Sequence, residues 1–93
     1  MGTSSEVNQD LKVMVSPEDV KGYIQSGLDC NHVSVIGDGQ HFEAVIVSAA
    51  FEDKGRLQRH QVVYAALGDR MKSEIHALSM KTLTPAEWEE QAS

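Results

Sequence analysis

The sequence predicts a single α+β domain in which a three-stranded mixed sheet carries its helices on one face, in the element order αββααβα. Two β-branched runs at 32–36 and 42–47 flank a turn sequence, and helical patterns separate them from a third alternating run at 75–83. A chain of 93 residues with one cysteine has room for one hydrophobic core and for no internal disulfide. We expect residues 1–11 to form a flexible leader and residues 12–90 to form the domain.

The first helix is expected to begin at Pro17. Ser16 is a typical N-cap residue, and proline at the first helical position costs nothing because the first N–H groups of a helix have no internal partner. The acidic residues at positions 18 and 19 stabilise the N-terminus of the helix, because that end carries a partial positive charge. Gly27 ends a run of apolar residues at helical spacing, which are Val20, Tyr23 and Ile24.

Residues 32–36 and 42–47 are predicted to form an antiparallel hairpin. Both runs are rich in valine and isoleucine, which favour extended backbone. The sequence Gly37-Asp38-Gly39-Gln40 lies between them, and its Asp-Gly pair tolerates the positive φ angles of tight hairpin turns.

A second helix is predicted over residues 56–67, between Gly55 and the Gly68-Asp69 pair. Apolar residues are expected on its buried face and basic residues on its exposed face. The buried face comprises Leu57, Val62 or Val63, Ala66 and Leu67, and the exposed face comprises Arg56, Arg59 and His60. A further short helical turn is expected at residues 70–73.

The third strand, at residues 75–83, follows these helices, so its connection to the strand at 42–47 is a crossover. A crossover of this kind places two neighbouring strands parallel. The last helix is expected to begin after Thr84, because Thr-Pro-Ala-Glu combines a hydroxyl cap, a proline at the first position and a glutamate that reaches back. Trp88 is expected to pack onto the domain.

The composition excludes several classes of function. The net charge of −6 repels nucleic-acid phosphates, so nucleic acid would need a local basic patch. The sequence has no apolar run of about 18 residues and no apolar signal core near its start, and we therefore expect a cytoplasmic protein without a membrane partner. Nucleophile elbows, phosphate-binding glycine loops and zinc-protease motifs are absent from the sequence, which favours a protein that is not an enzyme.

Three segments together resemble the BolA family, in particular its short bacterial members that end in Thr-Pro-Ala-Glu-Trp. They are Gly-Asp-Gly-Gln-His-Phe at 37–42, the basic helical sequence at 56–67, and Ile-His-Ala-Leu-Ser-Met-Lys at 75–81. The similarity covers residues 16–88. It implies a KH-like fold, a monothiol glutaredoxin partner, and a bridging [2Fe-2S] cluster shared with glutaredoxin and glutathione. The family is also linked to DNA binding, transcription regulation and the stress response.

The resemblance assigns the characteristic cluster ligand to His76 and the family's variable His-or-Cys position to His41. Two features depart from the family pattern. The match at 56–67 requires an additional Gln61, and Cys30 lies before the first strand instead of in the hairpin loop. Cys30 therefore does not inherit a ligand role, and we expect a buried or idle thiol there.

The expected topology supports a shared site independently of the resemblance. If the strands at 42–47 and 75–83 are parallel neighbours, His41 and His76 lie at the same ends of strands about 4.8 Å apart. Two imidazoles are too few for a complete metal site, so a partner must supply the other ligands. The alternatives are a solvated or capping His41 and a half-buried, hydrogen-bonded His76.

A basic segment at residues 54–72 has three readings. Its cations are Lys54, Arg56, Arg59, Arg70 and Lys72. The three interpretations are a solvated helix face, a docking surface for an acidic partner, and a contact for DNA phosphates. A DNA-binding regulator that uses the helix-turn-helix-like segment 56–73 is thus the alternative to the iron–sulfur partner. The segment lacks the Gly-x-x-Gly loop with which KH domains clamp RNA. His32 and His60 are expected to be surface residues. The sequence is also compatible with a weak homodimer of this chain.

Overall fold

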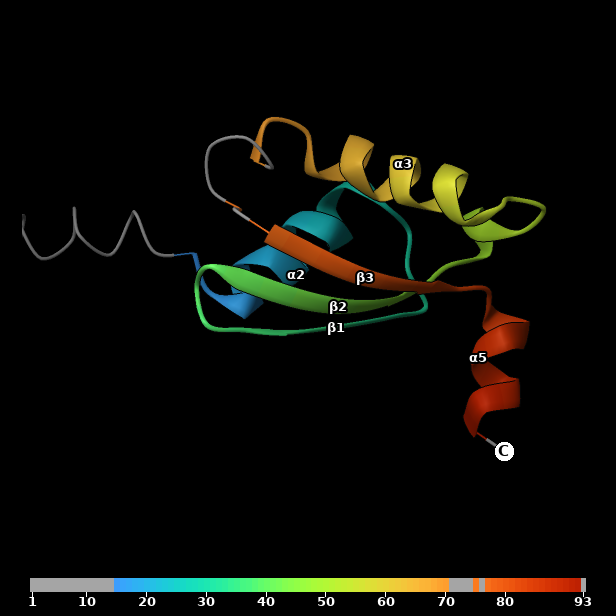
Figure 1. The fold of residues 1–93 in the computed structure, drawn as a ribbon. Helices are drawn as coiled ribbons and strands as arrows, with labels where there is room; N and C mark the ends of the chain where they lie inside the picture. Colours follow the sequence, from blue (N-terminus) through green and yellow to red (C-terminus); the bar gives the residue numbers. More distant parts are fainter. Residues whose placement is uncertain (1–14, 71–74, 76, 93) are drawn as a thin grey trace, which may run out of the picture.

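The computed structural model describes residues 15–70, 75 and 77–92 (Figure 1). Its elements follow the predicted order: α2 (Pro17–Gly27), β1 (His32–Gly37), β2 (His41–Val47), the 3-10 turn η1 (Ala49–Phe51), α3 (Arg56–Leu67), β3 (Ala77–Leu83) and α5 (Pro85–Ala92). The predicted leader lies outside the described residues. Of the helical turn predicted at 70–73, only Arg70 is described, and its backbone is helical.

The three strands form one mixed sheet in the order β1-β2-β3. β1 pairs antiparallel with β2, and Val33 lies opposite Ile46. β2 pairs parallel with β3, and Phe42 lies opposite Leu78. The predicted hairpin and the predicted parallel crossover are therefore both confirmed.

The turn between β1 and β2 is built around Asp38. Its carboxylate accepts hydrogen bonds from the backbone N–H groups of Gln40, at 3.0 Å, and His41, at 2.9 Å. These bonds, the one from His41 first, lower the pKa of Asp38. Gly39 has a φ of 99°, a conformation that glycine adopts without steric cost. The aspartate side chain and the glycine thus make the tight turn that the Asp-Gly pair predicts, and β2 begins one residue earlier than expected, at His41.

The core lies between one face of the sheet and the two helices α2 and α3, which cover that face together (Figure 1). Phe42, Ala44 and Ile46 alternate along β2 and are buried on this face. The helices contribute fully buried apolar side chains, which are Val20, Ile24, Val63 and Leu67. The prediction of helices on one face of the sheet is confirmed.

The predicted faces of α3 are wrong at three positions. Leu57, predicted to be buried, is 70% exposed, whereas Arg59 and His60, predicted to be exposed, are half-buried. Arg59, Val63 and Leu67 are spaced four residues apart, so they lie in one row along the helix and face the domain together. Leu57 precedes Arg59 by two residues, which turns it by about 200° around the helix axis and into solvent.

Helices α2 and α3 approach each other closely at Gly27. A Cβ atom at this position would lie 2.7 Å from the carbonyl oxygen of Ala66 and 2.9 Å from its Cα and Cβ atoms. We therefore expect Gly27→Ala to destabilise the domain by about 1–3 kcal/mol, the usual cost of overpacking. Urea unfolding measures the effect.

Gly22, in the middle of the same helix, is a matched control for this substitution. A Cβ at Gly22 meets no described atom within 4 Å. Gly22→Ala should thus stabilise the domain by about 0.5–1 kcal/mol, because alanine favours the helix. Equal effects of Gly22→Ala and Gly27→Ala would contradict close packing at Gly27.

Helix α5 lies beyond the end of the sheet that β3 reaches at Leu83 (Figure 1). Thr84 Oγ1 accepts the N–H of Glu87 at 3.2 Å, and Glu87 Oε1 accepts the N–H of Thr84 at 2.9 Å. This reciprocal pair is the predicted capping box.

The ring of Trp88 stacks on the ring of His32, with their centroids 4.7 Å apart. Trp88 therefore packs onto the domain as expected, and His32 is not a simple surface residue. No helix within residues 15–70 and 77–92 is long and apolar enough to cross a membrane.

Candidate functional site

The first candidate ligand, His41, lies at the start of β2 and is exposed. Its backbone N–H is held by the Asp38 carboxylate, so the hairpin turn fixes the position of the residue. In the parallel register, His41 lies opposite Ala77, the first residue of β3. The second candidate, His76, directly precedes Ala77 in the sequence and lies outside the described residues, so the predicted meeting of the two imidazoles stays a prediction.

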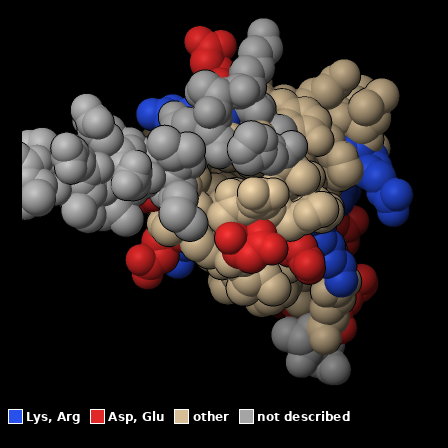
Figure 2. Space-filling view, turned by 60° about the vertical axis from the view of Figure 1, so that its left-hand side comes forward, with Lys and Arg blue, Asp and Glu red and all other residues tan. Residues whose placement is uncertain are grey.

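The alternation of β2 places His41 on the face of the sheet opposite α2 and α3. Phe42 and Ala44 point into the core, so the side chains of His41 and Glu43 project from the opposite face, where both are exposed. Figure 2, which turns the left-hand side of Figure 1 forward, shows acidic and basic side chains interspersed with uncharged surface. The side chain of His41 is thus exposed outside the core.

The described residues hold no group of three or more His, Cys, Asp and Glu side chains placed to bind a metal ion. Cys30 is half-buried, and its Sγ donates a hydrogen bond to the carbonyl oxygen of Leu28 at 3.3 Å. Burial, followed by the charge of Asp29, raises the pKa of the thiol. A raised pKa favours the protonated thiol, which is neither a metal ligand nor a nucleophile.

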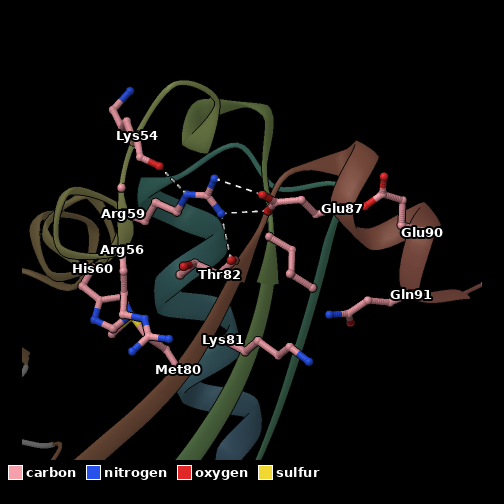
Figure 3. A pocket seen from close by; sticks show the side chains of 12 residues that line it. Lys54, Arg56, Arg59, His60, Met80, Lys81, Thr82, Glu87, Glu90 and Gln91 are labelled. Carbon is pink, nitrogen blue, oxygen red and sulfur yellow. Dashed lines mark hydrogen bonds and ion pairs between the residues drawn. The ribbon is translucent and has the colours of Figure 1, made fainter.

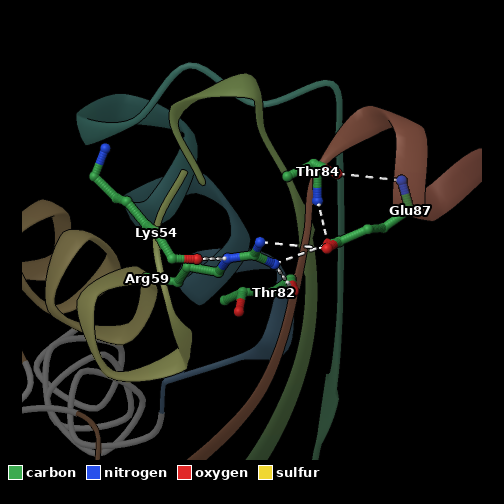
Figure 4. Close-up of polar contacts among 5 residues, drawn as sticks. All are labelled: Lys54, Arg59, Thr82, Thr84 and Glu87. Carbon is green, nitrogen blue, oxygen red and sulfur yellow. Dashed lines mark hydrogen bonds and ion pairs between the residues drawn. The ribbon is translucent and has the colours of Figure 1, made fainter. Parts of the chain in front are cut away.

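The predicted binding residue Arg59 makes hydrogen bonds within the domain. Its guanidinium contacts three separate segments (Figure 4). Nε donates to the carbonyl of Lys54 at 2.8 Å, and Nη1 donates to the carbonyl of Thr82 at 3.1 Å. Nη1 and Nη2 also bind the two carboxylate oxygens of Glu87, at 2.8 and 3.3 Å. The side chain of Arg59 is only 15% exposed, which contradicts the interpretation of Arg59 as part of a solvated helix face.

The contact with Arg59 has an electrostatic signature on Glu87. The hydrogen bond from Arg59, followed by the one from the backbone of Thr84, lowers the pKa of Glu87 from 4.5 to about 2. A carboxyl group whose pKa is lower in the folded than in the unfolded state stabilises the fold at pH values above its unfolded-state pKa. That contribution is lost as the pH falls through the folded-state value.

We therefore expect Glu87→Gln to destabilise the domain at pH 6 and to match the parent protein near pH 2. The difference between the two proteins should shrink as the pH falls from about 4.5 towards 2, the interval between the two pKa values. Urea unfolding midpoints over this pH range measure it. Parallel pH profiles for the two proteins would contradict the contact between Arg59 and Glu87.

The other predicted binding residues do not form one continuous face. Arg56 is exposed at the start of α3. The guanidinium of Arg70 lies over the ring of Tyr23, 4.2 Å from its centroid, and Lys54 Nζ donates to the carbonyl of Ala50 at 2.9 Å. The remaining predicted residue, Lys72, lies outside the described residues. Within the described part of the basic segment, Arg56 is thus the residue that best fits an exposed contact.

Sequence reasoning missed a groove of about 710 Å³ between α3, β3 and α5 (Figure 3). Arg56 and His60 line it from α3, Met80 and Lys81 from β3, and Glu90 and Gln91 from α5. No local sequence signal marks this groove, because its α3 wall is distant in the chain from the walls that β3 and α5 provide. The Thr-Pro-Ala-Glu cap is the one motif that locates a wall, since it fixes where α5 begins.

Comparison with known proteins identifies the fold described above. The model of the family of BolA-like proteins matches residues 11–87, which is most of the chain. The chain belongs to the BolA-like family. Membership confirms the resemblance carried by the segments at 37–42, 56–67 and 75–81.

Three BolA-like relatives show the range of the family. Human BolA-like protein 1 is 36% identical over 84 residues, which cover 90% of this chain and 59% of the human protein. A DNA-binding transcriptional regulator BolA from Haemophilus influenzae is 43% identical over 60 residues, or 64% of this chain and 58% of that protein. The solved structure of a BolA homologue from Coxiella burnetii superposes with a TM-score of 0.77 and 52% identity, covering 82% of this chain and 99% of that one. The match to this chain thus spans less than two thirds of the length of the human relative and of the Haemophilus influenzae relative.

Proposed function

We propose that this BolA-like chain is a non-enzymatic iron–sulfur partner protein. In this proposal it binds a monothiol glutaredoxin and contributes His41 and His76 to a bridging [2Fe-2S] cluster, which the two proteins share with glutathione. The observation that supports the proposal is the parallel register, in which exposed His41 lies opposite Ala77, the residue after His76.

The number of ligands explains why a partner is needed. A [2Fe-2S] cluster takes four ligands from outside the cluster, and these are thiolates or imidazoles. His41 and His76 supply two, so thiolates from glutaredoxin and glutathione supply the other two. The cluster is thus complete only in the mixed complex, and the isolated chain is expected to be free of it.

The position of His41 suits this role physically. The residue is exposed, so a cluster held on the surface of a partner can reach its imidazole. The hydrogen bonds of Asp38 to the N–H groups of Gln40 and His41 hold the turn in place before binding. A ligand whose backbone is already fixed loses less conformational entropy when it binds.

Mixing the isolated chain with a cluster-loaded monothiol glutaredoxin tests the proposal. Visible absorption and circular dichroism should change and then saturate as the chain is added, because an imidazole enters the ligand set. His41→Ala should reduce this change, whereas the matched variant His60→Ala, on α3, should not. Unchanged spectra, together with no mixed complex on gel filtration, would reject the iron–sulfur role.

DNA binding is the second candidate, and the name of the Haemophilus influenzae relative together with exposed Arg56 supports it. The structure gives it less support than the sequence pattern does, because Arg59 is occupied by Glu87. Arg56→Glu is the appropriate test, since Arg59→Glu would place two carboxylates together and disturb the fold. Salt-dependent binding to a defined duplex that Arg56→Glu abolishes would favour the regulator.

A further inference from the structure

The groove between α3 and α5 runs beside an open edge of the sheet. β3 is an edge strand, because β2 pairs with it on one side and no described strand pairs with it on the other. Open strand edges present unpaired N–H and C=O groups that can accept another extended chain. The groove is lined by consecutive residues of β3, from Met80 to Leu83, which places it along this edge.

The hydrogen bonds of β3 show which peptide groups face the groove. The carbonyl of Leu83 accepts the N–H of Ser48 at 3.0 Å, on the side of β2. The carbonyl of Thr82 accepts Arg59 at 3.1 Å, on the opposite side. Successive carbonyls of a strand point in opposite directions, so the peptide groups of Met80 point outward with that of Thr82. Across residues 15–70, 75 and 77–92, no hydrogen bond to the outward groups of Met80 is present.

The groove carries positive charge although the whole chain has a net charge of −6. Arg59 and Glu87 neutralise each other in their ion pair. The other charged residues of the lining are Lys54, Arg56, Lys81 and Glu90, three cations and one anion. Figure 3 shows the guanidinium of Arg56 and the ammonium of Lys81 on either side of the lower part of the groove.

We propose that this groove binds an extended acidic segment of a partner protein, which adds a strand to the outer edge of β3. Backbone hydrogen bonds at Met80 would hold the segment, and carboxylates of the segment would face Arg56 and Lys81. Strand addition of this kind takes its affinity from backbone bonds and its specificity from side chains beside the strand. Here the side chains beside the strand are predominantly basic.

This surface is separate from the proposed cluster ligands. Met80 lies three residues along β3 from Ala77, which is about 10 Å at the rise of an extended strand. An acidic segment can therefore bind at Met80 whether or not His41 and His76 hold a cluster. Failure of one proposal leaves the other standing.

A labelled model peptide tests the proposal with the intact chain. The probe is a ten-residue fluorescent peptide of alternating glutamate and threonine, and its control carries lysine in place of glutamate. The acidic peptide should bind in a fluorescence anisotropy titration, and the lysine peptide should not. Amide hydrogen exchange at Met80, measured by NMR, should slow at least tenfold when the peptide binds. The backbone N–H of Lys81 faces β2, so its exchange should not change.

Charge-reversal variants define the site further. Arg56→Glu and Lys81→Glu should each weaken binding of the acidic peptide at least fivefold, because each turns an attraction into a repulsion. Lys21→Glu, on the exposed side of α2, is the matched control and should change binding less than twofold. Absence of peptide binding, unchanged exchange at Met80, or an equal effect of Lys21→Glu would overturn the proposal. Tighter binding of single-stranded DNA than of the acidic peptide would also overturn it.

Discussion

The cluster of the mixed complex is expected to have a midpoint potential on the order of 100 mV or more above that of the cluster in the glutaredoxin homodimer. Imidazole is a neutral ligand and thiolate is an anion, so replacing thiolate by His41 and His76 stabilises the reduced state. Rieske centres, in which two histidines replace two cysteines, differ from all-thiolate clusters in the same direction. Redox titrations of the two complexes under the same conditions measure the difference.

The same exchange of ligands predicts greater sensitivity to acid. An imidazole must be neutral to bind iron, and its unperturbed pKa of about 6.5 means that protons compete with the metal in mildly acidic solution. As the pH falls from about 8 to 5.5, the mixed complex should lose its visible spectrum before the glutaredoxin homodimer does. Equal potentials together with coincident pH profiles would contradict histidine ligation and favour DNA binding.

His76→Ala is expected to produce the second large effect, a changed cluster spectrum and a shorter cluster lifetime in the mixed complex. The family resemblance gives His76 the more characteristic ligand position, and the position of His41 is variable in the family. His41→Ala should therefore have the smaller effect. Visible circular dichroism of the reconstituted complexes measures both.

The control for these variants is the fold of the isolated protein. Neither substitution is expected to change the far-ultraviolet circular dichroism, and exposed His41 lies outside the buried core. His60→Ala again provides a histidine substitution away from the start of β2. A larger effect of His41→Ala than of His76→Ala would reverse the ranking, and an unchanged spectrum in His76→Ala would remove His76 from the ligand set.

Local structure could be predicted from the sequence where the contacts lie within a few residues. The caps at Ser16 and Thr84 each involve an acidic residue three positions later, and both form as expected. The turn at Asp38 involves only the next three residues. Such contacts depend only on neighbouring residues and not on the tertiary fold, so the local sequence alone indicates them.

Contacts between distant segments could not be predicted in this way. Arg59 binds Thr82 and Glu87, which lie 23 and 28 positions later, and nothing in the basic pattern of the helix indicates these acceptors. The exposure of Leu57 has the same origin, because the row that faces the sheet is chosen by packing and not by hydrophobicity alone. The groove at Met80 also requires α3 to pack beside the distant β3 and α5.

The most direct measurement is the hyperfine coupling between nitrogen and the reduced cluster in the mixed complex. The chain is labelled with ¹⁵N in its histidines only and is combined with unlabelled, cluster-loaded glutaredoxin. Electron–nuclear double resonance should then show strong ¹⁵N coupling that weakens in His76→Ala and disappears when His41 is replaced as well. A reduced cluster bound to the mixed complex without strong ¹⁵N coupling would contradict the claim that this chain supplies histidine ligands.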